Sequence, residues 1–361
     1  MKIYKLIEKI CLSIINSCWI FFIRIHEKKN ILKKRKIYKN IKLTKGQKQQ
    51  IDNYFKKTYG KKISYKWHRL YTAYTGNFDY KYFPEYLFST RLDNNRIKVL
   101  EFENKALLNK LFDNVSNYIY IPKLYIKKIN GHYYDEDDNP IFEKEAINII
   151  KEKYNNFIIK KSIDSNSGRG VKIISLKKDN IDLKELFNSF GKNFIIEELI
   201  KQSKIVNKIY DKSINTLRIV TYQTDSGYYV APITMRIGRG GNDIDNAHAG
   251  GIFIAVDNQG YLGKKAFTEY NEQFLNHPDT NLKFNNYKLP NIELLREEII
   301  KLHKQLPNIK FISWDVAINE DNFFSLIEIN LHSQAVWLQQ MAHGKGFFQE
   351  NTDNILNNLR R

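Results

Sequence analysis

Residues 310–330 read KFISWDVAINEDNFFSLIEIN, two apolar runs joined by a polar turn, and this hairpin decides the fold. With Asp321-Asn322 as a two-residue turn, the register places Asp315 opposite Glu328. Paired residues on neighbouring strands share one face of the sheet, so the two carboxylates converge. Asn330 lies two residues beyond Glu328 and therefore projects to the same face.

These three side chains predict a metal site. Their neighbours, such as Trp314 and Ile329, are apolar, and carboxylate and amide oxygens suit one or two Mg²⁺ ions. Without a cation, two carboxylates side by side on a dry sheet would repel each other. The alternative is that Asp315 and Glu328 are edge carboxylates that face water.

A lysine and a glycine-rich loop lie between two predicted strands earlier in the chain. Residues 157–161 read FIIKK, residues 162–170 read SIDSNSGRG, and a strand resumes at Val171. Lys160 at a strand end can meet phosphate oxygens as a point charge, and the loop can offer them backbone N–H groups. The chain contains neither a GxxxxGK[ST] loop nor a GxGxxG after a strand, and a lone GxG is usually a tight turn. The order of lysine, loop and strand favours phosphate binding.

Two further features are weaker when taken alone. The apolar strand 194–197 runs into the paired acids Glu197 and Glu198, as many solvated strand ends do. Lys105 lies near the start of a predicted helix, where a surface lysine is equally common.

The remaining pattern indicates an α+β architecture. Strands are predicted at 215–223 and 228–236, joined around Asp225-Ser226-Gly227, a good hairpin signal. Residues 291–306 carry an apolar stripe at helical spacing. Hairpins mixed with helices argue against a regular βαβ array.

The charge of the chain is concentrated at its N-terminus. The 361 residues have a net charge of +19, of which +16 falls within residues 1–66, so the rest is nearly neutral. This distribution argues against a protein whose main partner is nucleic acid. The only two cysteines, Cys11 and Cys18, are about 10 Å apart along a helix, too far for a disulfide.

The first 25 residues predict a basic amphipathic helix. Ile7, Ile10, Ile14 and Phe21 recur at helical spacing, and lysines occupy the other side. Such a helix can lie in a membrane interface, with the basic tract that follows drawn to anionic lipid. The alternative is a helix packed on its own body or on a protein partner. The apolar run 10–23 is shorter than the roughly 20 residues that a membrane span needs, and no cleavage site for a signal peptide follows it.

Taken in order, the lysines, the loop, the strand at 194–197 and the hairpin resemble the ATP-grasp superfamily over residues 105–348. More narrowly, residues 213–221 (SINTLRIVT), 245–251 (DNAHAGG) and 343–346 (HGKG) resemble the sugar-transfer-associated ATP-grasp proteins, which are found with bacterial capsule and surface-polysaccharide genes. The resemblance implies an ATP-grasp fold, two α+β lobes with mostly antiparallel sheets that clamp the nucleotide. The implied division is a basic helical extension at 1–66, an N-terminal region with the small lobe at 67–196, and the large lobe at 197–361.

The resemblance also implies roles for single residues. Lys105 and Lys160 would contact the phosphates of ATP. The lid over these phosphates would consist of Gly168, Arg169 and Gly170. The hinge that receives adenine is Glu197, Glu198 and Ile200, and the Mg²⁺ ligands are Asp315, Glu328 and Asn330. Arg218 and Arg236 are candidates for holding the γ-phosphate and an acyl phosphate. The acidic residue that holds ribose in many relatives is absent, and Asn215 is the expected substitute.

The function that follows from the resemblance is ATP-dependent ligation. A carboxylate attacks the γ-phosphorus, and an amine or hydroxyl, such as that of a sugar acceptor, displaces phosphate from the acyl phosphate. His248 is a candidate general base or acceptor ligand, although a histidine in a Gly-rich turn is more often structural. We expect a cytoplasmic enzyme that modifies a surface-polysaccharide precursor, peripheral on the inner face of the plasma membrane. The alternatives are a kinase acting on a sugar hydroxyl and a non-catalytic nucleotide-binding scaffold.

Overall fold

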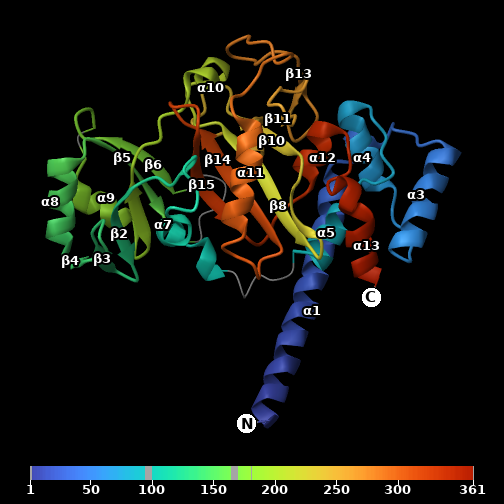
Figure 1. Ribbon diagram of the computed structural model, residues 1–361, viewed down its shortest axis with the longest axis horizontal. Helices are drawn as coiled ribbons and strands as arrows, with labels where there is room; N and C mark the ends of the chain where they lie inside the picture. The colour runs from blue at the N-terminus through green and yellow to red at the C-terminus, as the bar shows by residue number, and fades with distance from the viewer. Residues whose placement is uncertain (1, 94–99, 164–169, 180, 361) are drawn as a thin grey trace.

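The computed structural model describes residues 2–93, 100–163, 170–179 and 181–360. Figure 1 shows a small lobe, a larger lobe and a long N-terminal helix that projects from the body. Both lobes combine sheets with helices, and the predicted α+β class is confirmed.

The small lobe is a six-stranded antiparallel sheet covered by two helices. Its strands in spatial order are β4 (Pro140–Ile141), β3 (His132–Tyr134), β2 (Leu124–Ile129), β7 (Phe194–Glu197), β5 (Asn156–Lys161) and β6 (Val171–Ser175). The helices are α8 (Glu143–Lys153) and α9 (Leu183–Phe190), whose Ile150 and Phe187 pack against Phe157 and Ile159. α9 begins at Asp182, whose carboxylate accepts hydrogen bonds from the backbone N–H groups of the first turn.

The large lobe is built on a nine-stranded sheet. Its strands in spatial order are β1 (Ile119–Tyr120), β15 (Phe324–Asn330), β14 (Phe311–Ile318), β8 (Thr216–Thr224), β10 (Ile233–Ile237), β11 (Ile252–Val256), β12 (Ala266–Phe267) and β13 (Gln273–Phe274), with β9 (Gly227–Val230) beside β8. β1 pairs with β15 in parallel, and the other pairs are antiparallel. The strand predicted at 228–236 is thus two strands, because Pro232 has no N–H group for the ladder and interrupts it.

Ten further helices and four 3₁₀ turns complete the described chain. The α-helices are α1 (Lys2–Lys33), α2 (Arg35–Tyr38), α3 (Lys45–Thr58), α4 (Lys66–Thr75), α5 (Glu85–Arg91), α7 (Leu108–Phe112), α10 (Lys204–Ile209), α11 (Ile292–His303), α12 (Trp337–His343) and α13 (Thr352–Arg360). The 3₁₀ turns are η1 (Leu100–Glu103), η2 (Lys105–Leu107), η3 (Ala247–Ala249) and η4 (Gln349–Asn351).

The alternation of side chains along β8 explains how one strand contributes both to the apolar core and to a polar surface of the large sheet. Leu217 and Ile219 point to the core that α11 covers. On the opposite face, Val220 and Tyr222 pack under the helical layer, whereas Thr216 and Arg218 are polar. That face is therefore apolar at one end of the strand and polar at the other, and the polar end is left for a site.

The hairpin β14–β15 has the predicted pairing but not the predicted turn. Its loop spans residues 319–323, and the Asn319 side chain accepts hydrogen bonds from the amides of Asp321 (3.2 Å) and Phe323 (3.0 Å). Val316 pairs with Leu326 and Asp315 with Glu328, so Ile327 is the extra residue of a β-bulge. The longer loop and the bulge compensate each other, and Asp315 faces Glu328 as expected.

The helical layer does not respect the predicted boundary at residue 66. Ile51 and Phe55 of α3 are fully buried in a cluster with Tyr222 and Phe348 of the large lobe. Trp67 and Tyr71 of α4 pack with Phe253 and α12. Residues 35–93 therefore belong by packing to the large lobe, because their aromatic side chains cover one end of its sheet.

The N-terminal helix is longer than predicted. α1 runs over 32 residues, and Figure 1 shows its first half standing away from every other element. By length and composition alone, its stretch Tyr4–Lys33 is long and apolar enough to cross a membrane, so the prediction of a run too short to span was wrong. Leu12, Ile15 and Phe22 are exposed outside the predicted stripe, and the middle of the helix is apolar on more than one side.

Candidate nucleotide-binding site

A row of charged side chains crosses three adjacent strands of the large sheet. The register aligns Arg218 of β8 with Asp315 of β14, and Asp315 with Glu328 of β15. The Arg218 guanidinium donates twice to the Asp315 carboxylate, from Nε to Oδ1 at 2.6 Å and from Nη2 to Oδ2 at 3.1 Å. Such a two-point contact fixes the planes of both groups, so the row is rigid at its centre.

A second arginine joins the row from the next strand. Arg236 of β10 lies on the same face as Arg218, and its Nη2 is 3.1 Å from Asp315 Oδ2. Arg236 also donates to Thr216 Oγ1 and lies 3.5 Å from Asp245 Oδ2. Thr216 and Asp245 were not predicted, although both lie within the sequence motifs that carry the family resemblance.

The electrostatics of Asp315 follow from these partners. The carboxylate is buried, which by itself raises its pKa, but Arg218 and Arg236 outweigh that effect and hold the pKa below its ordinary value. Asp315 is therefore an anion at neutral pH, as phosphate and cation chemistry requires.

The two lobes meet at the end of this row. Lys105 Nζ lies 3.4 Å from Glu328 Oε2, and the amide of Lys105 donates to the carbonyl of Ser162 at the end of β5. Lys160 Nζ lies 3.5 Å from the carbonyl of Ile327, the bulge residue. Both predicted phosphate-binding lysines are thus brought to Glu328, one from η2 and one from β5.

The predicted hinge connects the small lobe to the large one. The Glu197 carboxylate forms an ion pair with Lys160, and burial raises the pKa of Glu197 despite that pairing. The side chain of Glu197 therefore positions Lys160. Glu198 donates its N–H to the carbonyl of Lys123 at 2.9 Å, Ile200 is buried, and the chain reaches the large lobe at Gln202.

Asn330 completes the predicted metal set at the end of β15. Its Nδ2 is buried and has no hydrogen-bond partner among the described residues, so this N–H donor is available to an acceptor such as a phosphate oxygen, whereas Oδ1 is the atom that a cation would contact. No group of three His, Cys, Asp or Glu side chains suited to a metal occurs in the described ranges. The predicted set instead combines two carboxylates with an amide, and these hard oxygen donors fit Mg²⁺.

Glu103 was missed by the sequence interpretation. Its carboxylate accepts hydrogen bonds from the backbone N–H groups of Leu331 and His332, and its Oε2 is 2.6 Å from His332 Nδ1. It thereby fixes the chain just beyond Asn330. A glutamate two residues before Lys105 gives no sequence signal of that role.

Asn215, the residue predicted to contact ribose, takes part in contacts within the large lobe. Asn215 is buried, its Oδ1 accepts from the Gly238 amide at 3.0 Å, and its Nδ2 donates to the carbonyl of Tyr210 at 2.6 Å. An amide with both ends used in this way holds the loop before β8 in place.

Only part of the predicted lid can be placed. Gly168 and Arg169 lie outside the described residues. Gly170 has a φ of 79°, and its carbonyl accepts the amide of Lys161, so it begins the return to β6.

The predicted His248 and the histidine of the 343–346 motif lie elsewhere in the large lobe. His248 Nδ1 is 2.6 Å from Glu269 Oε2, and its ring lies 5.7 Å from that of Trp337. His343 is partly buried, with Nε2 2.7 Å from the carbonyl of Ile233. A Cβ on Gly344 would lie 2.2 Å from Thr75 Oγ1, so this glycine allows α12 to approach α4.

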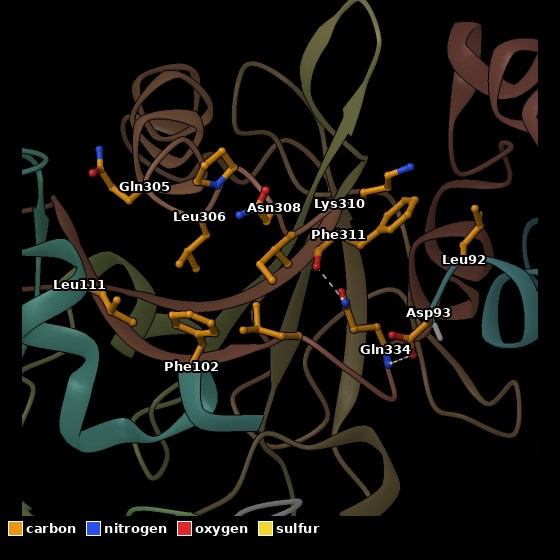
Figure 2. A pocket seen from close by; sticks show the side chains of 13 residues that line it. Leu92, Asp93, Phe102, Leu111, Gln305, Leu306, Asn308, Lys310, Phe311 and Gln334 are labelled. Carbon is orange, nitrogen blue, oxygen red and sulfur yellow. Dashed lines mark hydrogen bonds between the residues drawn. The ribbon is translucent and has the colours of Figure 1, made fainter. Parts of the chain in front are cut away.

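An apolar cavity of about 640 Å³ lies apart from the charged row. Figure 2 shows its lining by Phe102, Leu111, Leu306 and Phe311, with Gln334 at one side. Gln334 donates to the carbonyl of Phe311 and accepts from Ser313, so its polar atoms serve the fold. We assign this cavity no role in nucleotide binding.

Comparison with known proteins gave solved structures and one family. No curated protein matches. The solved structures include N5-carboxyaminoimidazole synthetase from Staphylococcus aureus complexed with ADP (11% identity, 67% of this chain, 47% of that chain, TM-score 0.39). They also include VanG D-Ala:D-Ser ligase from Enterococcus faecalis (15%, 72%, 62%, 0.42) and D-alanine-D-alanine ligase from Helicobacter pylori (16%, 72%, 57%, 0.38). The chain spans about half the length of the first of these structures.

The family result covers far more of the chain than any single motif. The family described as sugar-transfer associated ATP-grasp matches residues 88–356, which include both lobes, the charged row and the hinge. The chain therefore has the ATP-grasp fold and belongs to the sugar-transfer associated ATP-grasp family.

Proposed function

We propose that this protein is an ATP-dependent ligase that joins a carboxylate to an amine or hydroxyl through an acyl phosphate. The observation that carries the proposal is the row Arg218–Asp315–Glu328, extended by Arg236 and Lys105 at the junction of the two lobes. The two carboxylates, Asp315 and Glu328, are paired at its centre, and cations lie within ion-pair distance at both ends. A triphosphate needs such fixed cations on one side and a metal-holding carboxylate pair on the other.

The cations of the row neutralise the phosphates of ATP. Lys105 and Lys160, from the side of the small lobe, hold the α- and β-phosphates. Glu197 positions Lys160 through their ion pair. Arg218 and Arg236 hold the oxygens of the γ-phosphoryl group that is transferred. In this arrangement phosphate oxygens take over the donors that now contact Asp315 and Glu328, which frees both carboxylates.

The freed carboxylates, with Asn330, would hold one or two Mg²⁺ ions. Bound there, the metal would neutralise charge on the β- and γ-phosphates. The backbone around Glu198 and Ile200 receives adenine.

The chemistry then needs two substrates. The carboxylate oxygen of the first attacks the γ-phosphorus, forming the acyl phosphate while the bond to the ADP oxygen breaks. The amine or hydroxyl of the second attacks the acyl carbon and phosphate leaves. The protein contributes positioning, and exclusion of water that would hydrolyse the intermediate.

The proposed setting is the synthesis of a surface polysaccharide or capsule at the inner face of the plasma membrane. Two observations support it: the family is associated with sugar transfer, and α1 exposes apolar side chains with Arg24, Lys28 and Lys29 at its inner end. A nucleic-acid partner is not part of the proposal, since the body of the protein is nearly neutral.

The test is release of ADP by the full-length protein with MgATP and panels of amino acids and amino- or carboxyl-bearing nucleotide sugars. We expect ADP and free phosphate only when both substrates are present. A stable phosphorylated product from one substrate alone would support the kinase alternative. Asp315→Asn should lower kcat/KM on the order of 100-fold, because the proposed metal site loses one of its two carboxylates. Asp321→Asn, exposed in the loop of the same hairpin, is the control and should leave turnover unchanged. Equal turnover by both variants would contradict the proposed site.

A further inference from the structure

A cavity of about 910 Å³ lies at the base of α1, where that helix meets the large lobe. One wall is the inner half of α1 from Trp19 onward, together with Lys34, which follows that helix. The opposite wall includes Ser333, Trp337 and His248. Since these walls come from an exposed apolar helix and from the nucleotide-binding lobe, the cavity lies between the two.

Two short segments connect the cavity to the charged row. Ser333 comes three residues after Asn330, the last residue of β15. His248 comes three residues after Asp245, which lies 3.5 Å from Arg236. A molecule bound in the cavity therefore has the loops that leave the phosphate site as one of its walls.

The lining is unusually aromatic. Trp19, Trp67 and Trp337 all border the cavity, three of the four tryptophans of the chain. Large flat side chains offer apolar faces on which a sugar ring can stack, and polar groups among them orient the ring.

Buried charged groups lie among these rings. Lys34 Nζ is 2.9 Å from Glu269 and 4.6 Å from the centroid of the Trp337 ring. Glu27 is 8% exposed, and its Oε2 has no hydrogen-bond partner among the described residues. An unpartnered buried carboxylate oxygen is costly unless a bound hydroxyl group or water donates to it.

The outer rim combines cations with an apolar surface. Lys29 and Lys33 border the cavity and are exposed. Next to them along α1, Phe22 is 63% exposed and Ile25 37% exposed. This order of sugar-binding interior, cationic rim and apolar helix matches a molecule whose saccharide is joined through phosphate to an aliphatic chain.

We infer that the cavity binds the acceptor of the reaction, a saccharide carried on a polyprenyl chain through a diphosphate linkage. That the bound saccharide is the acceptor of the reaction rests on the proposed ligase function, but its binding in the cavity requires no ATP. The saccharide stacks on the tryptophans, Lys29 and Lys33 meet the diphosphate, and the prenyl chain runs along α1 into the bilayer.

The test measures binding without nucleotide. The full-length protein in dodecyl maltoside micelles is titrated with farnesyl diphosphate-linked N-acetylglucosamine, followed by tryptophan fluorescence. UDP-N-acetylglucosamine is the water-soluble comparison. We expect the prenyl-linked probe to bind at least about tenfold more tightly than the nucleotide sugar, since only it reaches the apolar surface.

Two matched pairs of substitutions distinguish the effect of cations at the cavity from the effect of net positive charge. Lys29→Ala with Lys33→Ala removes two cations from the rim, and Lys28→Ala with Lys36→Ala removes two exposed cations that do not border it. The first pair should weaken binding of the prenyl-linked probe by about tenfold or more, and the second should leave it unchanged. Equal loss in both pairs, or no binding by the wild type, would overturn the inference. Binding that survives while no ADP release is found would refute the ligase function and leave the cavity assignment standing.

Discussion

His343 is a partly buried imidazole at the end of α12, and desolvation lowers its pKa to about 4. Its Nε2 donates to the carbonyl of Ile233, so the neutral ring is part of the junction between α12 and β10. His68 and His303 are fully buried, and burial lowers the pKa of each to about 4. These residues make the stability of the protein sensitive to mild acid.

The sign follows from the direction of the shift. The unfolded chain takes up protons near pH 6.5, before the folded chain does, so stability falls as pH drops from about 6.5 to 4. Between pH 7 and 5 each histidine costs about 2 kcal/mol of unfolding free energy. His343→Gln keeps a donor for Ile233 and should remove about that much of the pH dependence. Urea unfolding at pH 7 and pH 5 measures this pH dependence. His132→Gln, at an exposed position of β3, is the control. An unaltered pH dependence in His343→Gln would show that the imidazole is not buried in its neutral form.

At the same scale, Asp315 shows why register matters more than turn type. The predicted two-residue turn and the observed five-residue loop differ, yet both place Asp315 opposite Glu328, because the bulge at Ile327 restores the pairing. One residue of slip would have turned Glu328 to the opposite face of the sheet. The charged row thus depends on a single extra residue in β15.

Among the elements, α1 divides into two parts with different surroundings. Residues 4–18 are exposed throughout, whereas Glu27 and Ile31 are buried against the body. Removing residues 2–18 should therefore leave the thermal midpoint within about 2 °C of the full-length value, because those side chains contribute no core packing. The same truncation should abolish co-sedimentation with phosphatidylglycerol vesicles.

Two comparisons complete that prediction. Phosphatidylcholine vesicles measure the share of binding that needs no anionic lipid. A truncation through residue 63 should lower the thermal midpoint strongly, since it removes the fully buried Ile51 and Phe55. Full-length and short-truncation proteins that pellet equally would falsify the membrane role of α1.

For the whole molecule, the proposed nucleotide site takes its residues from both lobes. Lys105 and Lys160 come from the side of the small lobe, and Arg218, Asp315 and Glu328 from the large sheet. A ligand that contacts residues of both lobes should stabilise both lobes against unfolding. At 100 times its Kd, MgATP should add about 2.7 kcal/mol to the free energy of unfolding.

A paired variant tests this sharing. Lys160→Met combined with Glu197→Gln removes the lysine without leaving a buried carboxylate unpaired, and should abolish most of the stabilisation by MgATP. Lys161→Met, at the exposed neighbouring position on β5, should retain it. Differential scanning calorimetry with and without MgATP measures both. Full stabilisation of the paired variant by MgATP would show that Lys160 is not part of the proposed phosphate site.

The sequence alone determined what depends on local pattern. Apolar runs bounded by turn residues identified β14, β15 and β8, the helical stripe at 291–306 identified α11, and the pairing of Asp315 with Glu328 followed from the hairpin. These predictions succeed because each element buries its own apolar face, and the spacing of that face is written in consecutive residues.

Tertiary packing decided the rest. The amide of Asn215 accepts a hydrogen bond from Gly238, far along the chain, a contact that the sequence pattern does not predict. Asp245 and Glu103 were not predicted, because their contacts with Arg236 and with the backbone of Leu331 are not revealed by local spacing. The cavity at the base of α1 exists because a helix from the N-terminus meets segments after β15 and before β11, and such long-range meetings are set by how whole faces pack.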